Sequence, residues 1–216
     1  MAEIITNNVQ KTPISELLLK ASWLSVLLGI VMELLVLGIA AGFKNPVTVQ
    51  GIGADLVQKV SWSTIVCLGL AIGSAATEMR HKFMGIAGFV AAPIAFHIAK
   101  ILSESTSLAL SLTLPSAIGL PSPILLTVVK GLQYAALGYI LGKISMDKDQ
   151  TVFKYLLAGL AVGVIFGGYL VYLTASVAIT PLPLAGIVSK SANEILFPIG
   201  CSLIIFTAHK LGEKNV

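Results

Sequence analysis

Long apolar runs separated by short polar segments dominate the chain. Each run is about 20 residues long, the length that an α-helix needs to cross about 30 Å of hydrocarbon. The pattern predicts six membrane-spanning helices, placed at residues 21–43, 60–77, 83–102, 124–144, 155–175 and 192–211. Residues 1–20 carry Glu3, Gln10 and Glu16, and we expect them to form a cytoplasmic segment and not a signal peptide. The sequence therefore predicts one all-α integral membrane domain over residues 1–216, built as a bundle of six transmembrane helices.

Two connections between the predicted helices are unusually apolar. Residues 103–122 and 176–189 are too short and too rich in proline to be further spans. Non-helical backbone at membrane depth is tolerated only where protein or a wet cavity covers it. These segments are either re-entrant pieces over a substrate path or loops packed flat against helix ends.

The composition agrees with a membrane location. Hydrophobic residues make up 56% of the chain and charged residues 11%, with a mean hydropathy of +0.93. A soluble domain carries about 25% charged residues, so a soluble globular enzyme is excluded. Cys67 and Cys201 both lie in apolar runs, which argues against a disulfide framework or a zinc site. No catalytic or phosphate-binding motif is present, so we expect no enzymatic activity, no cofactor and no metal.

The distribution of basic residues predicts the topology. If the N-terminus is cytoplasmic, nine basic residues lie on the cytoplasmic side: Lys11, Lys20, Arg80, Lys82, Lys143, Lys148, Lys154, Lys210 and Lys214. Four lie on the opposite side: Lys44, Lys59, Lys100 and Lys190. This asymmetry follows the positive-inside rule and predicts a cell-membrane protein with both termini in the cytoplasm. The net charge of +4 has the same cause, and we expect no nucleic-acid partner.

Short matches between the two halves of the chain suggest an internal repeat. Residues 37–42 resemble residues 137–142, and Glu33 aligns with Gln133 at the same offset. The first three helices would then repeat as the last three, as an inverted 3+3 repeat. The alternative is chance similarity, because small residues four apart recur wherever membrane helices pack closely.

Three polar residues stand out inside the first and fourth apolar runs. Ionisable side chains in a span are costly, so they usually face the bundle interior and have a role. Glu33 lies near the middle of its run, as either a proton or cation site or a structural carboxyl. Lys130 and Gln133 are three residues apart and are expected to share a helix face. Lys130 either extends to the membrane surface or pairs with a carboxylate, Glu194 or Glu33.

Three further candidates lie near the predicted outer ends of helices. Asn193 and Glu194 open the last span, ahead of Pro198, and are either a cation site or gate or an ordinary helix cap. His97 is either a residue that titrates near neutral pH or an interfacial side chain bonded to a neighbour.

These residues favour a small multi-pass transporter or channel, proton- or cation-coupled, with a polar path near the bilayer midplane. The residues expected to bind substrate or ion are Glu33, His97, Lys130, Gln133, Asn193 and Glu194. The alternative is a non-catalytic membrane subunit that binds substrate or stabilises a partner in a larger complex. The expected partners are membrane lipids, a small solute or ion, and either further copies of the chain or a partner subunit.

Overall fold

The computed structural model describes residues 14–44, 48–76, 78–112 and 121–213, apart from the side chains of the last three. Over these residues the secondary structure is entirely helical. The elements are α1 (Ile14–Gly42), α2 (Val49–Ser74), α3 (Arg80–Ala109), α4 (Pro123–Ile144), α5 (Val152–Val162), η1 (Gly163–Gly167), α6 (Gly168–Val177) and α7 (Leu184–Glu213). Most of the predicted N-terminal segment, residues 1–13, lies outside the described part.

Six long helices in the described chain are apolar enough to cross a membrane, which confirms the predicted all-helical bundle of six long apolar helices. The fifth is continuous over Val152–Val177, because α5 and α6 are joined by the single π-helical turn η1. Large apolar side chains cover the outside of the bundle; Trp23, Ile124 and Tyr172, for example, are more than two-thirds exposed. Such an exterior matches hydrocarbon and not water.

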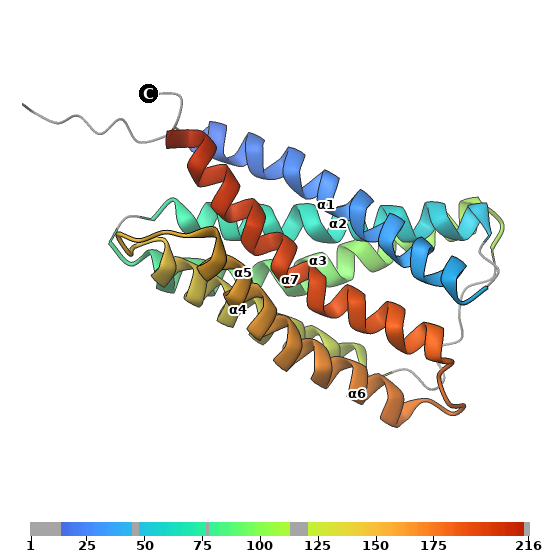
Figure 1. The fold of residues 1–216 in the computed structure, drawn as a ribbon. Helices are drawn as coiled ribbons and strands as arrows, with labels where there is room; N and C mark the ends of the chain where they lie inside the picture. The colour runs from blue at the N-terminus through green and yellow to red at the C-terminus, as the bar shows by residue number, and fades with distance from the viewer. Residues whose placement is uncertain (1–13, 45–47, 77, 113–120, 214–216) are drawn as a thin grey trace, which may run out of the picture.

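The helices lie side by side and run roughly along one common direction (Figure 1), and their contacts close into a ring. Each of α1, α2, α3, α4 and α5 contacts the next along the chain, and α7 packs against both α5 and α1. Residues far apart in sequence therefore meet inside the ring. The thiols of Cys67 on α2 and Cys201 on α7, for instance, are free, fully buried and 3.3 Å apart.

Four helices extend well beyond their predicted apolar runs. α1 begins at Ile14 and not at residue 21. α2 begins at Val49 and not at residue 60, with the Thr48 hydroxyl accepting a hydrogen bond from the Gly51 amide. α3 continues to Ala109, and α7 begins at Leu184 and not at residue 192. The connection predicted over 176–189 thus shrinks to residues 178–183, between α6 and α7. Of the other apolar connection, residues 113–120 lie outside the described part.

Glycines allow the helix backbones to approach closely, but not everywhere the sequence predicted. A side chain at Gly138 on α4 would overlap the Met84 carbonyl of α3, and one at Gly159 on α5 would overlap Ile199 of α7. In contrast, Gly38 and Gly42 on α1 have nothing within 4 Å of the position that a side chain would take. We expected most of the glycine pairs spaced four apart to pack closely; those of α4 and α5 do, whereas Gly38 and Gly42 do not, although Gly29 earlier on α1 packs against Val60 of α2.

Candidate functional site

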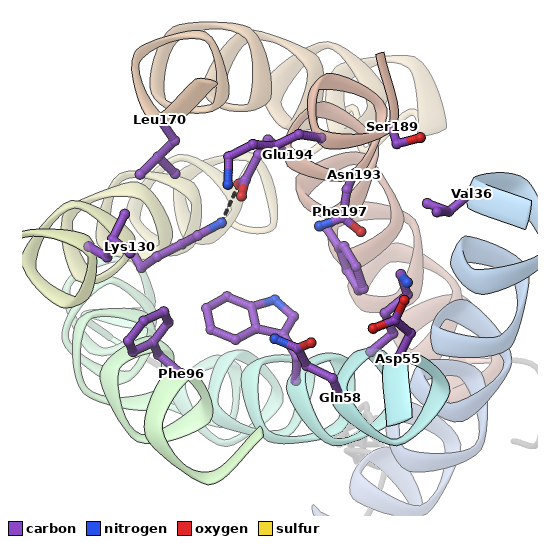
Figure 2. Close-up of a pocket in the computed structure, with 14 residues that line it drawn as sticks. Val36, Asp55, Gln58, Phe96, Lys130, Leu170, Ser189, Asn193, Glu194 and Phe197 are labelled. Carbon is purple, nitrogen blue, oxygen red and sulfur yellow. Dashed lines mark hydrogen bonds and ion pairs between the residues drawn. The ribbon is translucent and has the colours of Figure 1, made fainter. Parts of the chain in front are cut away.

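A pocket of about 550 Å³ lies in the half of the bundle where α2, α4 and α7 begin and α1 and α3 end. Figure 2 shows side chains from several helices pointing into it. Its charged and polar lining consists of Asp55, Gln58, Lys59, Lys130, Ser189, Lys190, Asn193 and Glu194. Its apolar lining consists of Val36, Trp62, Phe96, Leu126, Leu170 and Phe197. A volume of this size suits a small organic molecule.

Lys130 on α4 forms an ion pair with Glu194 on α7 (Figure 2). The two side chains are only 13% and 9% exposed, so little water screens the pair. The Lys130 ammonium also lies 5.2 Å from the centre of the Trp62 ring, a cation–π distance. The prediction that Lys130 pairs with a carboxylate is confirmed, and Glu194 is its partner.

Glu33 on α1 forms a second buried ion pair, with Lys59 on α2. Glu33 is 3% exposed and lies nine residues from the end of α1, so it is farther from the helix centre than the predicted span implied. Sequence reasoning missed Lys59, because this residue immediately precedes the predicted second span. The helical spacing of Asp55, Lys59 and Trp62 would have revealed it, since residues three, four and seven apart share one helix face.

Lys190 on α7 adds a third ammonium group to the pocket. It lies one helical turn before Glu194, whose carboxylate attracts it, while the Lys130 ammonium repels it. Asp55 lines the pocket from α2. Neither Lys190 nor Asp55 has an ion-pair partner among the residues that the structure describes.

Asn193 and Glu194 lie ten and eleven residues into α7, because this helix begins at Leu184. Their interpretation as a helix cap is therefore wrong, and both line the pocket instead. The Asn193 side-chain oxygen is buried and has no hydrogen-bond partner within the described chain. A buried acceptor without a partner is unfavourable, so a donor brought close to it would stabilise this side of the pocket.

Three of the predicted site residues, Glu33, Gln133 and His97, do not line the pocket. Glu33 is connected to it only through its ion pair with Lys59, which does line it. Gln133 is fully buried, and within the described residues neither its amide nitrogen nor its oxygen has a hydrogen-bond partner. It faces packed protein, whereas Lys130 one turn earlier reaches the pocket. His97 lies on the exposed side of α3, where its Nε2 is 3.3 Å from the Thr127 hydroxyl of α4. This contact favours the interfacial interpretation of His97.

The π-helical turn η1 brings its helix close to α7 beside the pocket. A side chain at Gly167 would lie 3.0 Å from both the Cβ and the carbonyl oxygen of Glu194, and one at Gly163 would lie 2.5 Å from the Ile195 carbonyl. The next turn places Leu170 in the pocket wall. Single π-helical turns are rare and frequently occur at functional sites.

The chain matches no protein-family model, no curated protein and no solved structure. The chemistry of the pocket must therefore be judged from its side chains. Within the described residues no three histidine, cysteine or acidic side chains are grouped so as to hold a metal ion. The arrangement combines ammonium and carboxylate groups with an aromatic wall, which suits non-covalent recognition of a small charged molecule.

Proposed function

We propose that this protein is a small multi-pass transporter that carries a small solute through the pocket. The observation that supports the proposal is the concentration of five charged side chains around a cavity inside a bundle of apolar helices. A buried ion pair stabilises a fold poorly, because desolvation of both charges offsets much of their attraction. Charged groups retained at such a cost inside a membrane protein usually mark a substrate or ion path.

The far end of the pocket favours a transporter over an open channel. Beyond Trp62 the same face of α2 continues with Val66, Cys67 and Leu70, which are all fully buried. Packed side chains thus close the bundle below the cavity. A solute could pass only if the helices rearranged, which is the alternating-access behaviour of secondary transporters.

Three finer features belong to the same proposal. The protein resides in the cell membrane with both termini cytoplasmic, so the pocket faces outward. The helices form an inverted 3+3 repeat; their closed ring of contacts is compatible with this symmetry. Transport is coupled to a proton or cation, with the buried Glu33 carboxylate as the coupling group because it can exchange a proton or cation for its bond to Lys59.

Cysteine accessibility tests alternating access without knowledge of the substrate. Asn193→Cys, in a background with Cys67 and Cys201 replaced by alanine, places a thiol in the pocket. A transporter should allow a membrane-impermeant methanethiosulfonate to reach this thiol in both right-side-out and inside-out vesicles. Ile205→Cys, fully buried on the same helix and outside the pocket, is the control that should not react. Labelling of Asn193→Cys from one side only would contradict transport.

Glu33→Gln tests the coupling. This change keeps the shape of the side chain and removes its charge. The protein is reconstituted in proteoliposomes loaded with a pH-sensitive dye, and a mixture of small metabolites is added outside. The internal pH should change in vesicles that contain the original protein and not in vesicles that contain Glu33→Gln. Asp147→Asn, an exposed carboxylate in the α4–α5 connection, is the matched control. Equal proton movement in Glu33→Gln would make Glu33 a structural residue.

A second candidate is a membrane subunit of a larger complex, and one observation favours it. Gly38 and Gly42 form a small-xxx-small pair on α1 with open space beside them, a surface on which another transmembrane helix could pack closely. If a partner helix occupies this surface, Gly38→Leu should shift the protein in solubilised cell membranes to a smaller species on native gels. Leu34→Met, on an exposed part of α1, should not. An unchanged native mass with Gly38→Leu would contradict the subunit role.

A further inference from the structure

Six charged groups, five that line the pocket and Glu33 that pairs with one of them, divide into two triads of opposite formal charge. Glu33, Asp55 and Lys59 form the acidic triad on α1 and α2; two carboxylates and one ammonium give −1. Lys130, Lys190 and Glu194 form the basic triad on α4 and α7; two ammoniums and one carboxylate give +1. In each triad two members pair with each other, which leaves Asp55 and Lys190 to carry the excess charge.

The two triads lie on opposite sides of the cavity. In Figure 2 Asp55 projects from α2 on one side, while the Lys130–Glu194 pair lies across the pocket from it. Lys190 belongs to the second side, because both Glu194 and Lys130 act on its charge. Trp62, Phe96 and Phe197 add aromatic surface to the wall. The pocket therefore has an acidic end, a basic end and an apolar wall.

We infer that the pocket binds an elongated zwitterion, a small molecule with a cationic amine at one end, a carboxylate at the other and an apolar body between them. The inference rests on the proposed function and names the class of its solute. Such a ligand neutralises both excess charges at once: that of Lys190, which is partly buried and costly to leave uncompensated, and that of Asp55, which is exposed. Asp55 binds the amine, Lys190 the carboxylate, and the buried Asn193 oxygen accepts a hydrogen bond from the amine or a neighbouring donor.

Ligands with a single charge suit this arrangement less well. A simple organic anion would compensate the basic triad and leave the acidic triad without a partner, and an organic amine would do the reverse. An α-amino acid carries both charges on one carbon, which suits charged groups on opposite sides of a pocket less well than a molecule with its charges at two ends. The same reasoning predicts that ω-amino acids and short peptides bind better than α-amino acids.

Matched aromatic probes test the inference on the purified protein in lipid nanodiscs. The zwitterion is 4-(aminomethyl)benzoate; 4-methylbenzoate keeps only its carboxylate, 4-methylbenzylamine keeps only its amine, and phenylalanine places both charges on one carbon. Trp23→Phe leaves Trp62 as the single tryptophan, so fluorescence reports directly from the pocket. We expect 4-(aminomethyl)benzoate to bind about tenfold or more tightly than each of the other three.

Removal of one charge at each end should have opposite consequences. Lys190→Gln should weaken binding of 4-(aminomethyl)benzoate and 4-methylbenzoate by about ten- to a hundredfold and leave 4-methylbenzylamine unaffected. Asp55→Asn should weaken the binding of 4-(aminomethyl)benzoate and of 4-methylbenzylamine, and should leave the affinity for 4-methylbenzoate unchanged. Lys100→Gln and Glu104→Gln remove an exposed ion pair on α3, outside the pocket, and should change none of the affinities.

Several results would overturn the zwitterion assignment. One is that 4-methylbenzoate binds as tightly as 4-(aminomethyl)benzoate and that Asp55→Asn changes neither affinity. Another is that phenylalanine binds more tightly than 4-(aminomethyl)benzoate, and a third is that none of the probes binds. The accessibility experiment on Asn193→Cys separates this failure from failure of the transport proposal. If Asn193→Cys is labelled from both sides but the zwitterion is not preferred, the transport proposal stands and the ligand class is wrong. If Asn193→Cys is labelled from one side only but the zwitterion is preferred, the ligand class stands and the transport proposal is wrong.

Discussion

At the scale of single residues, two buried ion pairs join neighbouring helices of the bundle. Glu33–Lys59 connects α1 to α2, and Lys130–Glu194 connects α4 to α7. Each pair is neutral overall, yet loss of one member leaves a charge in a poorly hydrated site. The cost of breaking a pair therefore greatly exceeds what the intact pair contributes to stability.

A double-mutant cycle on Lys130 and Glu194 tests this argument. Lys130→Met and Glu194→Gln should each lower the free energy of unfolding by about 3–5 kcal/mol, because each leaves its partner's charge buried and unpaired. The double variant should lose much less than the sum of the two. Denaturation in mixed detergent micelles measures all four proteins. Additive losses would show that the two side chains do not interact.

Gln133 gives a second prediction at this scale. Its buried amide has no hydrogen-bond partner in the described part of the chain, and such a group destabilises the fold by about 1–3 kcal/mol. Gln133→Met has a similar volume and should raise the free energy of unfolding, with no effect on binding because Gln133 does not line the pocket. Gln58→Met, at an exposed position, should change stability by less than about 0.5 kcal/mol. Destabilisation by Gln133→Met would reveal a bonding partner for the amide.

At the scale of elements, hydropathy located the helices better than it located their ends. Six apolar runs predicted six long helices, because only a helix satisfies its own backbone in hydrocarbon. The first turns of α2 and α7 were missed because they carry polar side chains such as Asp55, Lys59 and Lys190. Those turns supply most of the charged pocket residues, so an error at helix ends became an error about the site.

The candidate site could be predicted only in part for a related reason. Lys130, Asn193 and Glu194 stood out because they interrupt apolar sequence, and all three line the pocket. The choice of Lys59 over Gln133 as the partner of Glu33 depends on which helices are neighbours in the ring, and sequence periodicity carries no such information. Residues three apart differ by about 60° around a helix, which is enough to place Lys130 in the pocket and Gln133 against packed protein.

A matched pair of glycine substitutions tests helix packing. Gly138 and Gly38 align in the apparent repeat, but only Gly138 touches a neighbouring helix. Gly138→Ala should lower the free energy of unfolding by about 1–3 kcal/mol, because its methyl group meets the Met84 carbonyl. Gly38→Ala should be neutral or stabilising by up to about 1 kcal/mol, since alanine favours a helix. Equal losses at the two positions would mean that α1 also packs closely at Gly38.

At the scale of the whole molecule, the two ends of the bundle differ in charge more than the sequence suggested. Of the four basic residues assigned to the outer side, Lys59 and Lys190 line the pocket. Only Lys44 and Lys100 of that set lie away from it, against seven basic residues at the other end among those that the structure describes. Charges held in a pocket next to carboxylates contribute little to orientation, so the remaining asymmetry favours a cytoplasmic location for both termini still more strongly.

The orientation of the pocket follows from this asymmetry and can be tested with two exposed positions at opposite ends of the bundle. Lys44→Cys lies after α1, at the pocket end, and Lys148→Cys lies between α4 and α5 at the other end. In a background with Cys67 and Cys201 replaced by alanine, a membrane-impermeant maleimide should label Lys44→Cys in right-side-out vesicles and Lys148→Cys only in inside-out vesicles. Each substitution removes one positive charge, and the larger surplus at the Lys148 end means that neither loss should reverse the topology. The opposite pattern would place the pocket on the cytoplasmic side and make the protein an exception to the positive-inside rule. Labelling of both positions from the same side would instead contradict the arrangement of α1 and α4 in the ring.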